Sequence, residues 1–147
     1  MTDGSNALEA ALARLECEQI MMRSMTNIDG RRSDLNLEYF TEDAHFGARG
    51  AANADVTGLE ALRVVSEKRD ARPERNTLSV VAGFDFQWIS SDEAEARGNF
   101  VRWVGENPAP ELERWLGRFV RVDGSWKLRE MLTEPFPPAA PFSDDAT

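Results

Sequence analysis

The chain has 147 residues, of which 41% are hydrophobic and 29% charged, a composition typical of a globular protein rather than a disordered one. Acidic residues outnumber Lys and Arg by 26 to 17, and the formal net charge of −9 argues against nucleic acid and anionic membrane surfaces as partners, because both are bound through clustered cations. No apolar run approaches the length of about 20 residues that a membrane span needs, and the first residues do not resemble a signal peptide, so we expect a cytoplasmic protein.

No Pro-, Gly- or Ser-rich linker interrupts the chain. We therefore expect a single domain over residues 1–147, with a core at about 8–132 and a Pro-rich tail at 135–147. The single cysteine, Cys17, excludes an internal disulfide and a cysteine-based metal cluster, and we expect it to pack as a small core residue. With one histidine, one cysteine and no ligand-spaced cluster, the sequence predicts neither a metal centre nor a cofactor.

The first predicted element is a long amphipathic helix at about 8–28, with Asp3, Ser5 or Asn6 as its N-cap and Gly30 as its C-terminal stop. Its apolar positions recur at helical spacing: Leu8, Leu12, Leu15, Met22 and Met25, with Ala11, Ile20, Met21 and Ile28 widening the face. This apolar face is wider than a surface helix needs. We therefore expect the rest of the chain to wrap around the helix.

Two shorter helices and a strand follow. Ser33 or Asp34 is expected to cap the first short helix, which leads into a strand at about 44–48. Residues 49–55 are small and polar, which predicts a mobile loop at the rim of a binding site. The next helix is predicted at 59–70, with Leu62, Val64 and Val65 on its buried side, and Pro73 bars its continuation.

Four strand-like runs complete the core, at about 77–89, 93–104, 111–122 and 125–132, and Asp123-Gly124 indicates a tight hairpin between the last two. In the first run, period-2 alternation predicts one shared face for Leu78, Val80, Ala82, Phe84, Phe86 and Trp88. The small residues of the second run, Ala94, Ala96 and Gly98, leave space above that strand. These elements predict an α+β fold in which a curved sheet closes around the long helix and leaves an apolar hollow.

Four short stretches carry a resemblance to a known family. They are Ile28-Asp29-Gly30, Phe40-Thr41-Glu42-Asp43-Ala44, Gly58-Leu59-Glu60-Ala61-Leu62 and Arg121-Val122-Asp123-Gly124-Ser125-Trp126-Lys127-Leu128. In this order and spacing, over about residues 8–132, the chain resembles the SnoaL-like branch of the NTF2-like superfamily, which includes scytalone dehydratase-like and ketosteroid isomerase-like proteins.

The resemblance implies an α+β cone. In this fold a strongly curved, mostly antiparallel sheet wraps around a long N-terminal helix and two shorter helices, and a pocket opens into the cone. It also implies a homodimer formed through the outer sheet face. Its members include dehydratases, dehydrochlorinases, ketosteroid isomerases, polyketide cyclases and epoxide hydrolases, as well as non-catalytic β-subunits of ring-hydroxylating dioxygenases, and the fold alone does not choose among these.

The catalytic residues of the family match this sequence in part. In dehydratase and dehydrochlorinase members, an aspartate at the end of the first helix orients a pocket histidine that acts as a base, and Asp29 matches that aspartate. The histidine is missing, because its place falls at or near Arg75. A second histidine of the dehydratases would fall near residues 98–100, and the strand aspartate of the isomerases would fall near 47–48. No known catalytic set is present intact.

Two residues are candidates for acid–base chemistry. Asp29 is either a general base, or the partner of one, in the apolar hollow, or a turn aspartate bonded to local backbone before Gly30. His45 is the only histidine and an adaptable acid–base group. The alternation along its strand leaves open whether His45 faces the pocket or the outside.

Two arginines are candidates for stabilising negative charge. Arg75 cannot act as a base but suits a carbonyl or carboxylate, and its alternative is a solvated arginine after the turn at Pro73. Arg102 lies on an otherwise apolar strand face and needs a partner, so it is either a substrate clamp or half of an ion pair with Asp29 or Glu18.

Two functional hypotheses follow. The first is a cofactor-independent lyase or isomerase, of dehydratase or cyclase type, on a small hydrophobic ring compound with an enolisable carbonyl or a hydroxyl leaving group. Its catalytic residues would be Asp29, His45, Arg75 and Arg102, and its substrate-binding residues Met22, Met25, Phe46, Phe84 and Phe100. The second, motivated by the missing histidine, is a non-catalytic ligand-binding or accessory subunit that resembles a dioxygenase β-subunit.

Overall fold

The computed structural model describes residues 2–49 and 54–136. Three helices and six strands follow one another in the chain: α1 (Thr2–Asp29), η1 (Ser33–Tyr39), β1 (Phe40–Ala48), β2 (Ala54–Thr57), α2 (Leu59–Asp70), β3 (Thr77–Trp88), β4 (Glu93–Val104), β5 (Glu111–Val122) and β6 (Ser125–Pro135). Most of the predicted loop at 49–55 and most of the Pro-rich tail lie outside the described residues.

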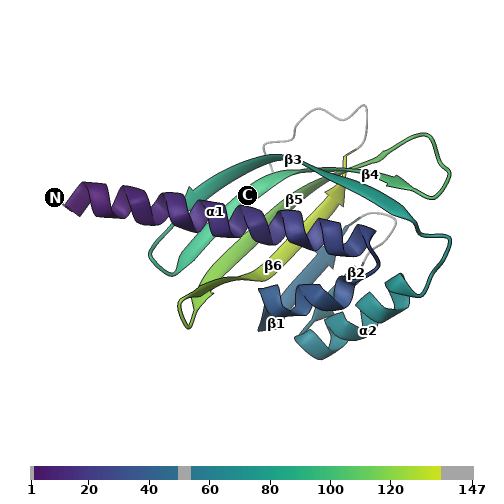
Figure 1. Ribbon diagram of the computed structural model, residues 1–147, viewed down its shortest axis with the longest axis horizontal. Helices are drawn as coiled ribbons and strands as arrows, with labels where there is room; N and C mark the ends of the chain where they lie inside the picture. The colour runs from purple at the N-terminus through teal and green to yellow at the C-terminus, as the bar shows by residue number, and fades with distance from the viewer. Residues whose placement is uncertain (1, 50–53, 137–147) are drawn as a thin grey trace.

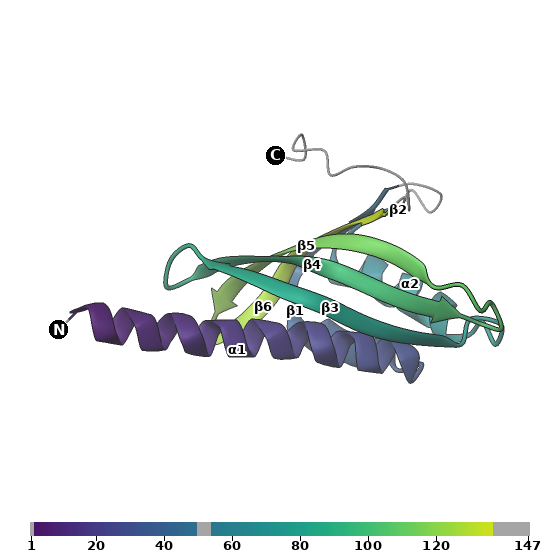
Figure 2. The same ribbon diagram turned by 90° about the horizontal axis from the view of Figure 1, so that it is seen from above.

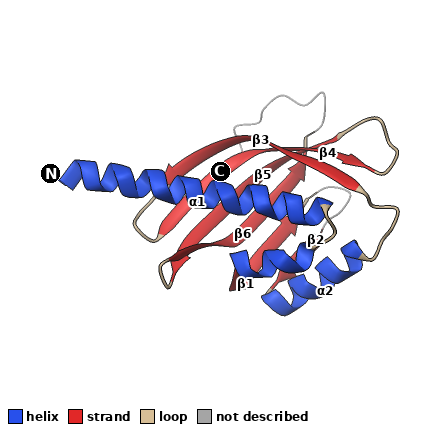
Figure 3. Ribbon diagram, in the orientation of Figure 1, coloured by secondary structure: helices blue, strands red, loops and turns tan. Residues whose placement is uncertain are grey.

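The six strands form one sheet in the order β2-β1-β6-β5-β4-β3. Every neighbouring pair is antiparallel except β1 and β6, which run parallel. Figures 1 and 3 show α1 crossing one face of this sheet, with η1 and α2 gathered beside β1 and β2. Figure 2 shows the curvature of the sheet behind α1. The predicted α+β fold, with a curved and mostly antiparallel sheet against three helices, is confirmed. No helix in the described ranges is long and apolar enough to cross a membrane.

The buried face of α1 differs from the predicted one. Ala13, Cys17, Ile20, Met21 and Met25 are its buried apolar residues. In contrast, the predicted stripe is largely outside the core, with Leu8 62% and Met22 51% exposed. The helix also begins at Thr2, earlier than predicted, and Figure 1 shows its N-terminal part extending past the strand ends, where no sheet is present to cover it. The helical period was therefore right, but the predicted face was too wide: Ile20, Met21 and Met25 lie in the core, whereas Leu8, Leu12, Leu15 and Met22 lie outside it.

The strand β3 changes its buried face partway along. Residues Thr77, Ser79 and Val81 are partly buried, whereas Leu78 is 61% and Val80 46% exposed. The pairing with β4 is irregular between Ala82 and Asp85, around Gly83 with its φ of +86°. Beyond this bulge the partly buried residues are Phe84, Phe86 and Trp88. The extra residue reverses the alternation, so the predicted single face for all six apolar residues was wrong.

Several element boundaries also differ from those predicted. The strand β1 begins at Phe40 and pairs with β2, a short strand that the sequence analysis did not predict. The helix α2 has the predicted bounds, but it buries Leu62 and Ser66 and leaves Val64 and Val65 exposed. The hairpin at Asp123-Gly124 is confirmed, with φ angles of +51° and +80° that suit a tight primed turn.

The space predicted above the small residues of β4 is filled by an aromatic ring. A Cβ atom at Gly98 would lie 2.8 Å from the Trp115 ring and 2.4 Å from the Gly83 carbonyl oxygen. Trp115 in turn stacks on Phe100, with ring centroids 5.7 Å apart. Glycine is required at this position because β3 and Trp115 approach the backbone too closely for any side chain.

Candidate functional site

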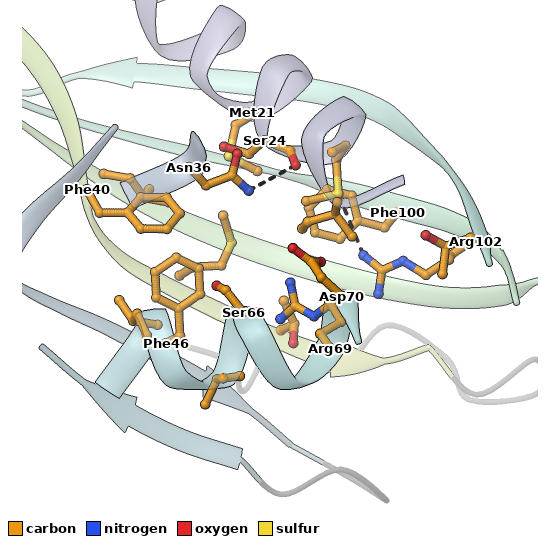
Figure 4. A pocket seen from close by; sticks show the side chains of 18 of the residues that line it. Met21, Ser24, Asn36, Phe40, Phe46, Ser66, Arg69, Asp70, Phe100 and Arg102 are labelled. Atoms are coloured by element: carbon orange, nitrogen blue, oxygen red, sulfur yellow. Dashed lines mark hydrogen bonds between the residues drawn. The ribbon is translucent and has the colours of Figure 1, made fainter. Parts of the chain in front are cut away.

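A cavity of about 170 Å³ lies between the helices and the inner face of the sheet. Figure 4 shows its side chains converging from α1, η1, α2 and the strands. Its lining consists of Met21, Ser24, Met25, Ile28, Arg31, Asn36, Phe40, Phe46, Leu62, Val65, Ser66, Arg69, Asp70, Arg75, Thr77, Phe100, Arg102, Glu113, Leu128, Met131 and Thr133. The cavity is thus the apolar hollow that the sequence predicts inside the cone.

One part of the cavity is apolar and rigidly packed. Met21, Met25, Phe40, Phe100 and Leu128 are buried members of the main hydrophobic core and also line the cavity. Phe40 packs against Phe46 with ring centroids 4.8 Å apart. Core side chains of this kind hold a fixed shape, so this part of the site suits the apolar body of a small molecule.

The other part of the cavity is charged. Arg31, Arg69, Arg75 and Arg102 line it together with two acids, Asp70 and Glu113. Figure 4 shows Arg69, Asp70 and Arg102 at the same end of the cavity, with Arg69 and Asp70 on α2 and Arg102 on β4. Six charged side chains along one side of an apolar hollow are a concentrated electrostatic feature.

Arg102 is held in place on several sides. Its Nε donates a hydrogen bond of 3.1 Å to the Ser79 hydroxyl, and one terminal nitrogen lies 3.6 Å from the Met25 sulfur. The other terminal nitrogen forms an ion pair of 3.5 Å with the carboxylate of Glu113. The guanidinium also lies 5.8 Å from the centre of the Phe100 ring. Arg102 is therefore a fixed positive charge beside an acid.

The predicted partners of Arg102 were wrong in detail. Arg102 pairs with Glu113 rather than with Asp29 or Glu18. It reaches Asp29 only through Ser79, whose hydroxyl accepts from Arg102 and donates to the Asp29 carboxylate over 2.9 Å. The prediction that Arg102 lies on the inner face and needs a partner is confirmed.

Arg69 differs from Arg102 in its surroundings. Among residues 2–49 and 54–136, its guanidinium forms no hydrogen bond or ion pair. Burial lowers the pKa of Arg69, the positive charges of Arg102 and Arg75 lower it further, and Asp70 opposes them. The neighbouring carboxylate of Asp70 is engaged elsewhere, because it accepts hydrogen bonds from the Ser33 amide and hydroxyl over 2.9 and 2.7 Å.

Asp29 binds the backbone and side chains of β3. Its carboxylate accepts hydrogen bonds from the Thr77 hydroxyl over 2.6 Å, the Ser79 amide over 2.7 Å and the Ser79 hydroxyl. Asp29 is not among the cavity-lining residues. The aspartate that matches the family therefore joins the end of α1 to the edge strand β3. It is neither a base inside the cavity nor a turn aspartate bonded to local backbone.

His45 lies on the outer side of the sheet. Phe46, its neighbour on β1, lines the cavity, and the alternation along the strand directs His45 the other way. Its Nδ1 is 2.9 Å from the Glu130 carboxylate, and its Nε2 is 2.5 Å from that of Asp55. Hydrogen bonds to Glu130 and, second, to Asp55 raise the pKa of His45. The structure does not bring His45 and Asp29 together.

The remaining predicted site residues divide into two groups. Arg75, Met25, Phe46 and Phe100 line the cavity, as predicted. Met22 lies on the exposed side of α1, and Phe84 packs against Trp115 with ring centroids 5.6 Å apart. Neither is among the cavity-lining residues, because the buried side of α1 and the bulge in β3 place them elsewhere.

Two other chemistries are limited by the structure. Cys17 is fully buried, and burial, with a smaller contribution from Glu16, raises the pKa of its thiol to about 12. A thiolate nucleophile there is therefore unavailable at neutral pH. Across the described residues, no group of three or more His, Cys, Asp or Glu is placed to hold a metal ion.

The sequence analysis missed Glu113, Arg69 and Asp70. Glu113 precedes Trp115 by two residues on β5, so it shares the face of a buried aromatic ring. That acid on an inward face was a usable signal, equivalent to the one that singled out Arg102. Arg69 and Asp70 gave no such signal, because charged residues in the last turn of a helix are normally solvated.

Comparison with known families gives one match over most of the chain. A family model described as a SnoaL-like domain matches residues 9–131. No curated protein matches the sequence.

Solved structures with the same fold include three informative neighbours. An NTF2-like protein with a cystatin-like fold from Novosphingobium aromaticivorans has a TM-score of 0.80 at 16% identity, over 95% of this chain and 92% of that one. A protein from the same organism, described provisionally as a scytalone dehydratase, has a TM-score of 0.73 at 20% identity, over 93% and 89%. The hexachlorocyclohexane dehydrochlorinase LinA-type3 from Novosphingobium barchaimii has a TM-score of 0.74 at 14% identity, over 93% and 98%. At these identities the likeness shows the fold alone.

Proposed function

This chain belongs to the SnoaL-like domain family, and we propose that it catalyses a cofactor-independent lyase or isomerase reaction on a small, largely apolar ring compound bound in the cavity. Glu113 is the proton acceptor in this proposal, and Arg102 stabilises the negative charge that develops. The proposal replaces Asp29 and His45 as the acid–base pair, because neither lines the cavity.

One observation carries the proposal. The carboxylate of Glu113 faces a largely apolar cavity, 3.5 Å from the fixed guanidinium of Arg102. In the described part of the chain it forms no hydrogen bond to another side chain. Asp70, the other acid of the lining, has both oxygens engaged by Ser33. Glu113 is therefore the carboxylate with oxygen lone pairs available for a proton.

The chemistry needs no further reactant. Glu113 takes a proton from a carbon of the ligand, and the electron pair of that C–H bond forms a new C=C bond. In an isomerisation the adjacent carbonyl becomes an enolate, Arg102 stabilises its oxygen, and Glu113 returns the proton to another carbon. In an elimination the neighbouring hydroxyl departs with its bonding electrons, receives the proton that Glu113 has taken, and leaves as water. Proton transfer by a positioned acid or base contributes about 10²- to 10⁴-fold to such rates.

The structural neighbours support this class of reaction without specifying a substrate. One of them is a dehydrochlorinase and another is described provisionally as a scytalone dehydratase, and both names denote eliminations. A dehydratase or cyclase reaction uses the same two requirements, a base and a stabilised negative charge in a dry cavity.

The test is a screen for conversion. Wild-type protein is incubated with small ring compounds that carry an enolisable carbonyl or a hydroxyl leaving group, and mass spectrometry follows both bound and free material. Conversion is expected for at least one compound, with the rate in Glu113→Gln lower by about 10²-fold or more. Glu106→Gln, in the exposed turn after β4, is the matched control and should convert it normally. Full activity in Glu113→Gln would overturn the proposal.

A second candidate is a non-catalytic binding or accessory subunit. The observation that favours it is that no histidine lines the cavity: Arg75 lies there in place of the family's histidine, and His45 lies on the outer side of the sheet. Tight binding without conversion, or co-purification with a larger oxygenase-type partner, would establish this role.

In either case we propose that the chain forms a homodimer, which sedimentation analysis would detect as twice the chain mass.

A further inference from the structure

We infer that the ligand of this cavity is a small ring-containing carboxylic acid, and that Arg69 binds its carboxylate. This inference rests on the proposed use of the cavity as a ligand site, and it adds the chemical class of the ligand and the residue that selects it.

The first observation concerns the surroundings of the Arg69 guanidinium. In the ranges 2–49 and 54–136 its guanidinium has neither a hydrogen-bond acceptor nor an ion-pair partner. The nearest acid along the chain, Asp70, instead accepts hydrogen bonds from the Ser33 amide and hydroxyl. A guanidinium that is largely removed from water and unpaired is costly, because its charge and donors are not compensated. A bound anion would supply both the negative charge and the hydrogen-bond acceptors.

The second observation is the balance of charge among the residues that line the cavity. Four arginines and two acids line the cavity, although the whole chain carries a net charge of −9. Glu113 offsets Arg102, and Arg31 donates hydrogen bonds to the Pro73 carbonyl over 2.7 Å and to Asn76 over 2.6 Å. Arg75 is exposed to solvent, so Arg69 is left as the partly buried cation with open donors. The site is therefore electropositive inside an acidic protein, which favours an anionic ligand over a neutral one.

The third observation is that α2 and β4 direct arginines toward the same space. Figure 4 shows Arg69 on α2 approaching the same space as Arg102 on β4. Two cations in one small cavity repel each other, and the charge of Arg102 adds to burial, the larger cause, in lowering the pKa of Arg69. An anion between them would convert this repulsion into attraction. The planar fork of a guanidinium matches a carboxylate through two parallel hydrogen bonds, so a carboxylate is the best-fitting group.

The fourth observation is the size and polarity of the rest of the cavity. A cavity of about 150 Å³ lined by apolar side chains is large enough to bind benzene, and this one measures about 170 Å³. Met21, Phe40 and Phe100 provide apolar and aromatic surfaces beside the charged end. A single ring fits against them, with its carboxylate directed at Arg69. The ring would then present its reacting carbon to Glu113.

The experiment compares acids with neutral analogues of the same shape. Isothermal titration calorimetry measures the affinity of the wild-type protein for benzoate, phenylacetate and cyclohexanecarboxylate, for the corresponding amides, and for phenyl phosphate. A charge-assisted hydrogen bond contributes about 1.5–3 kcal/mol, so an acid is expected to bind about 10- to 100-fold more tightly than its amide. This comparison uses the wild-type protein alone and does not depend on any variant folding.

Variants then assign the effect to Arg69. Arg69→Gln should remove the preference for acids, Arg69→Lys should keep part of it, and Arg72→Gln, an exposed arginine just after α2, should keep all of it. Arg69→Gln should also raise the unfolding temperature of the ligand-free protein, because it removes a desolvated, unpaired charge. A merely structural arginine would give the opposite change in unfolding temperature.

Each outcome separates this inference from the proposed reaction. Equal or tighter binding of the amides, preservation of the acid preference in Arg69→Gln, or no binding of any acid at millimolar concentration would overturn the inference. Tighter binding of phenyl phosphate than of every acid would overturn the assignment to a carboxylate. Acids that bind preferentially but are not converted would support the inference and contradict the lyase proposal. Conversion of neutral ring compounds without a preference for acids would support the lyase proposal and contradict the inference.

Discussion

The carboxylate of Asp29, the last residue of α1, accepts a hydrogen bond of 2.7 Å from the backbone amide of Ser79 on β3. Two further hydrogen bonds, from the hydroxyls of Thr77 and Ser79, complete the contact. Three donors on the edge strand β3 are thus satisfied by one side chain of the helix. This junction fixes the end of α1 over the sheet and, through Ser79, the position of Arg102 in the cavity.

Replacing Asp29 by alanine should therefore destabilise the fold. Removing the acceptor leaves partly buried donors of β3 unsatisfied, and we expect the free energy of unfolding to fall by about 2 kcal/mol. Urea denaturation at neutral pH measures this change. Asp34→Ala, which removes an exposed acid paired with Arg32, should change it by less than about 0.5 kcal/mol. Identical stability of Asp29→Ala and wild type would show that the junction is dispensable.

Gly98 should not tolerate a side chain. A methyl group there would meet the Gly83 carbonyl oxygen at 2.4 Å and the Trp115 ring at 2.8 Å, and the backbone oxygen cannot move aside cheaply. We expect Gly98→Ala to lower the free energy of unfolding by about 2 kcal/mol or more. Thermal denaturation measures this change. Gly4→Ala, at an exposed position of α1 with no atom within 4 Å, is the control and should be neutral or slightly stabilising in that assay. A Gly98→Ala protein as stable as wild type would contradict the packing described for β3 and β4.

His45 should stabilise the protein in a pH-dependent manner. Hydrogen bonds to Glu130 and Asp55 raise the pKa of His45 in the folded state above its usual value near 6.5. Its protonated form therefore stabilises the folded state fully below that usual value, and the contribution is lost as pH rises through the raised pKa.

The matching measurement is the melting temperature of wild type and His45→Gln at about pH 6 and about pH 9. The loss caused by the substitution should be larger at the lower pH. Because His45 is the only histidine in the sequence, the difference between the two proteins isolates its titration. An equal loss at both pH values would contradict the account of the cluster formed by His45, Glu130 and Asp55.

Most of the fold could be predicted from local patterns. The bounds of α2, β4 and β5 and the Asp-Gly hairpin follow from helical periodicity, alternation and turn chemistry. The errors arose where a long-range contact decided the outcome. The bulge at Gly83 exchanges the two faces of β3. The projection of the N-terminal part of α1 past the sheet exposes Leu8, whereas Met22 is exposed because it lies on the side of α1 that faces away from the sheet. Neither effect is encoded within a window of a few residues.

The candidate site could be predicted only in part for a similar reason. Arg102 and Phe100 were found because a charge and an aromatic ring on one strand face are visible in the alternation. Arg69 looks like an ordinary cation in the last turn of a helix, and only the approach of α2 to the sheet turns it into the cavity. Asp29 matched the family pattern, but Ser79 and Thr77, which engage it, lie far along the chain.

The central claim is that Glu113 exchanges a proton with a carbon atom of a ligand in this cavity. The most direct measurement is deuterium incorporation into a bound ring compound in D₂O, followed by NMR and mass spectrometry, because it detects proton transfer even without net conversion. We predict incorporation with wild-type protein and with Glu106→Gln, and a rate at least about 100-fold lower with Glu113→Gln. Equal incorporation by wild type and Glu113→Gln, or none by wild type with a ligand shown to occupy the cavity, would contradict the claim.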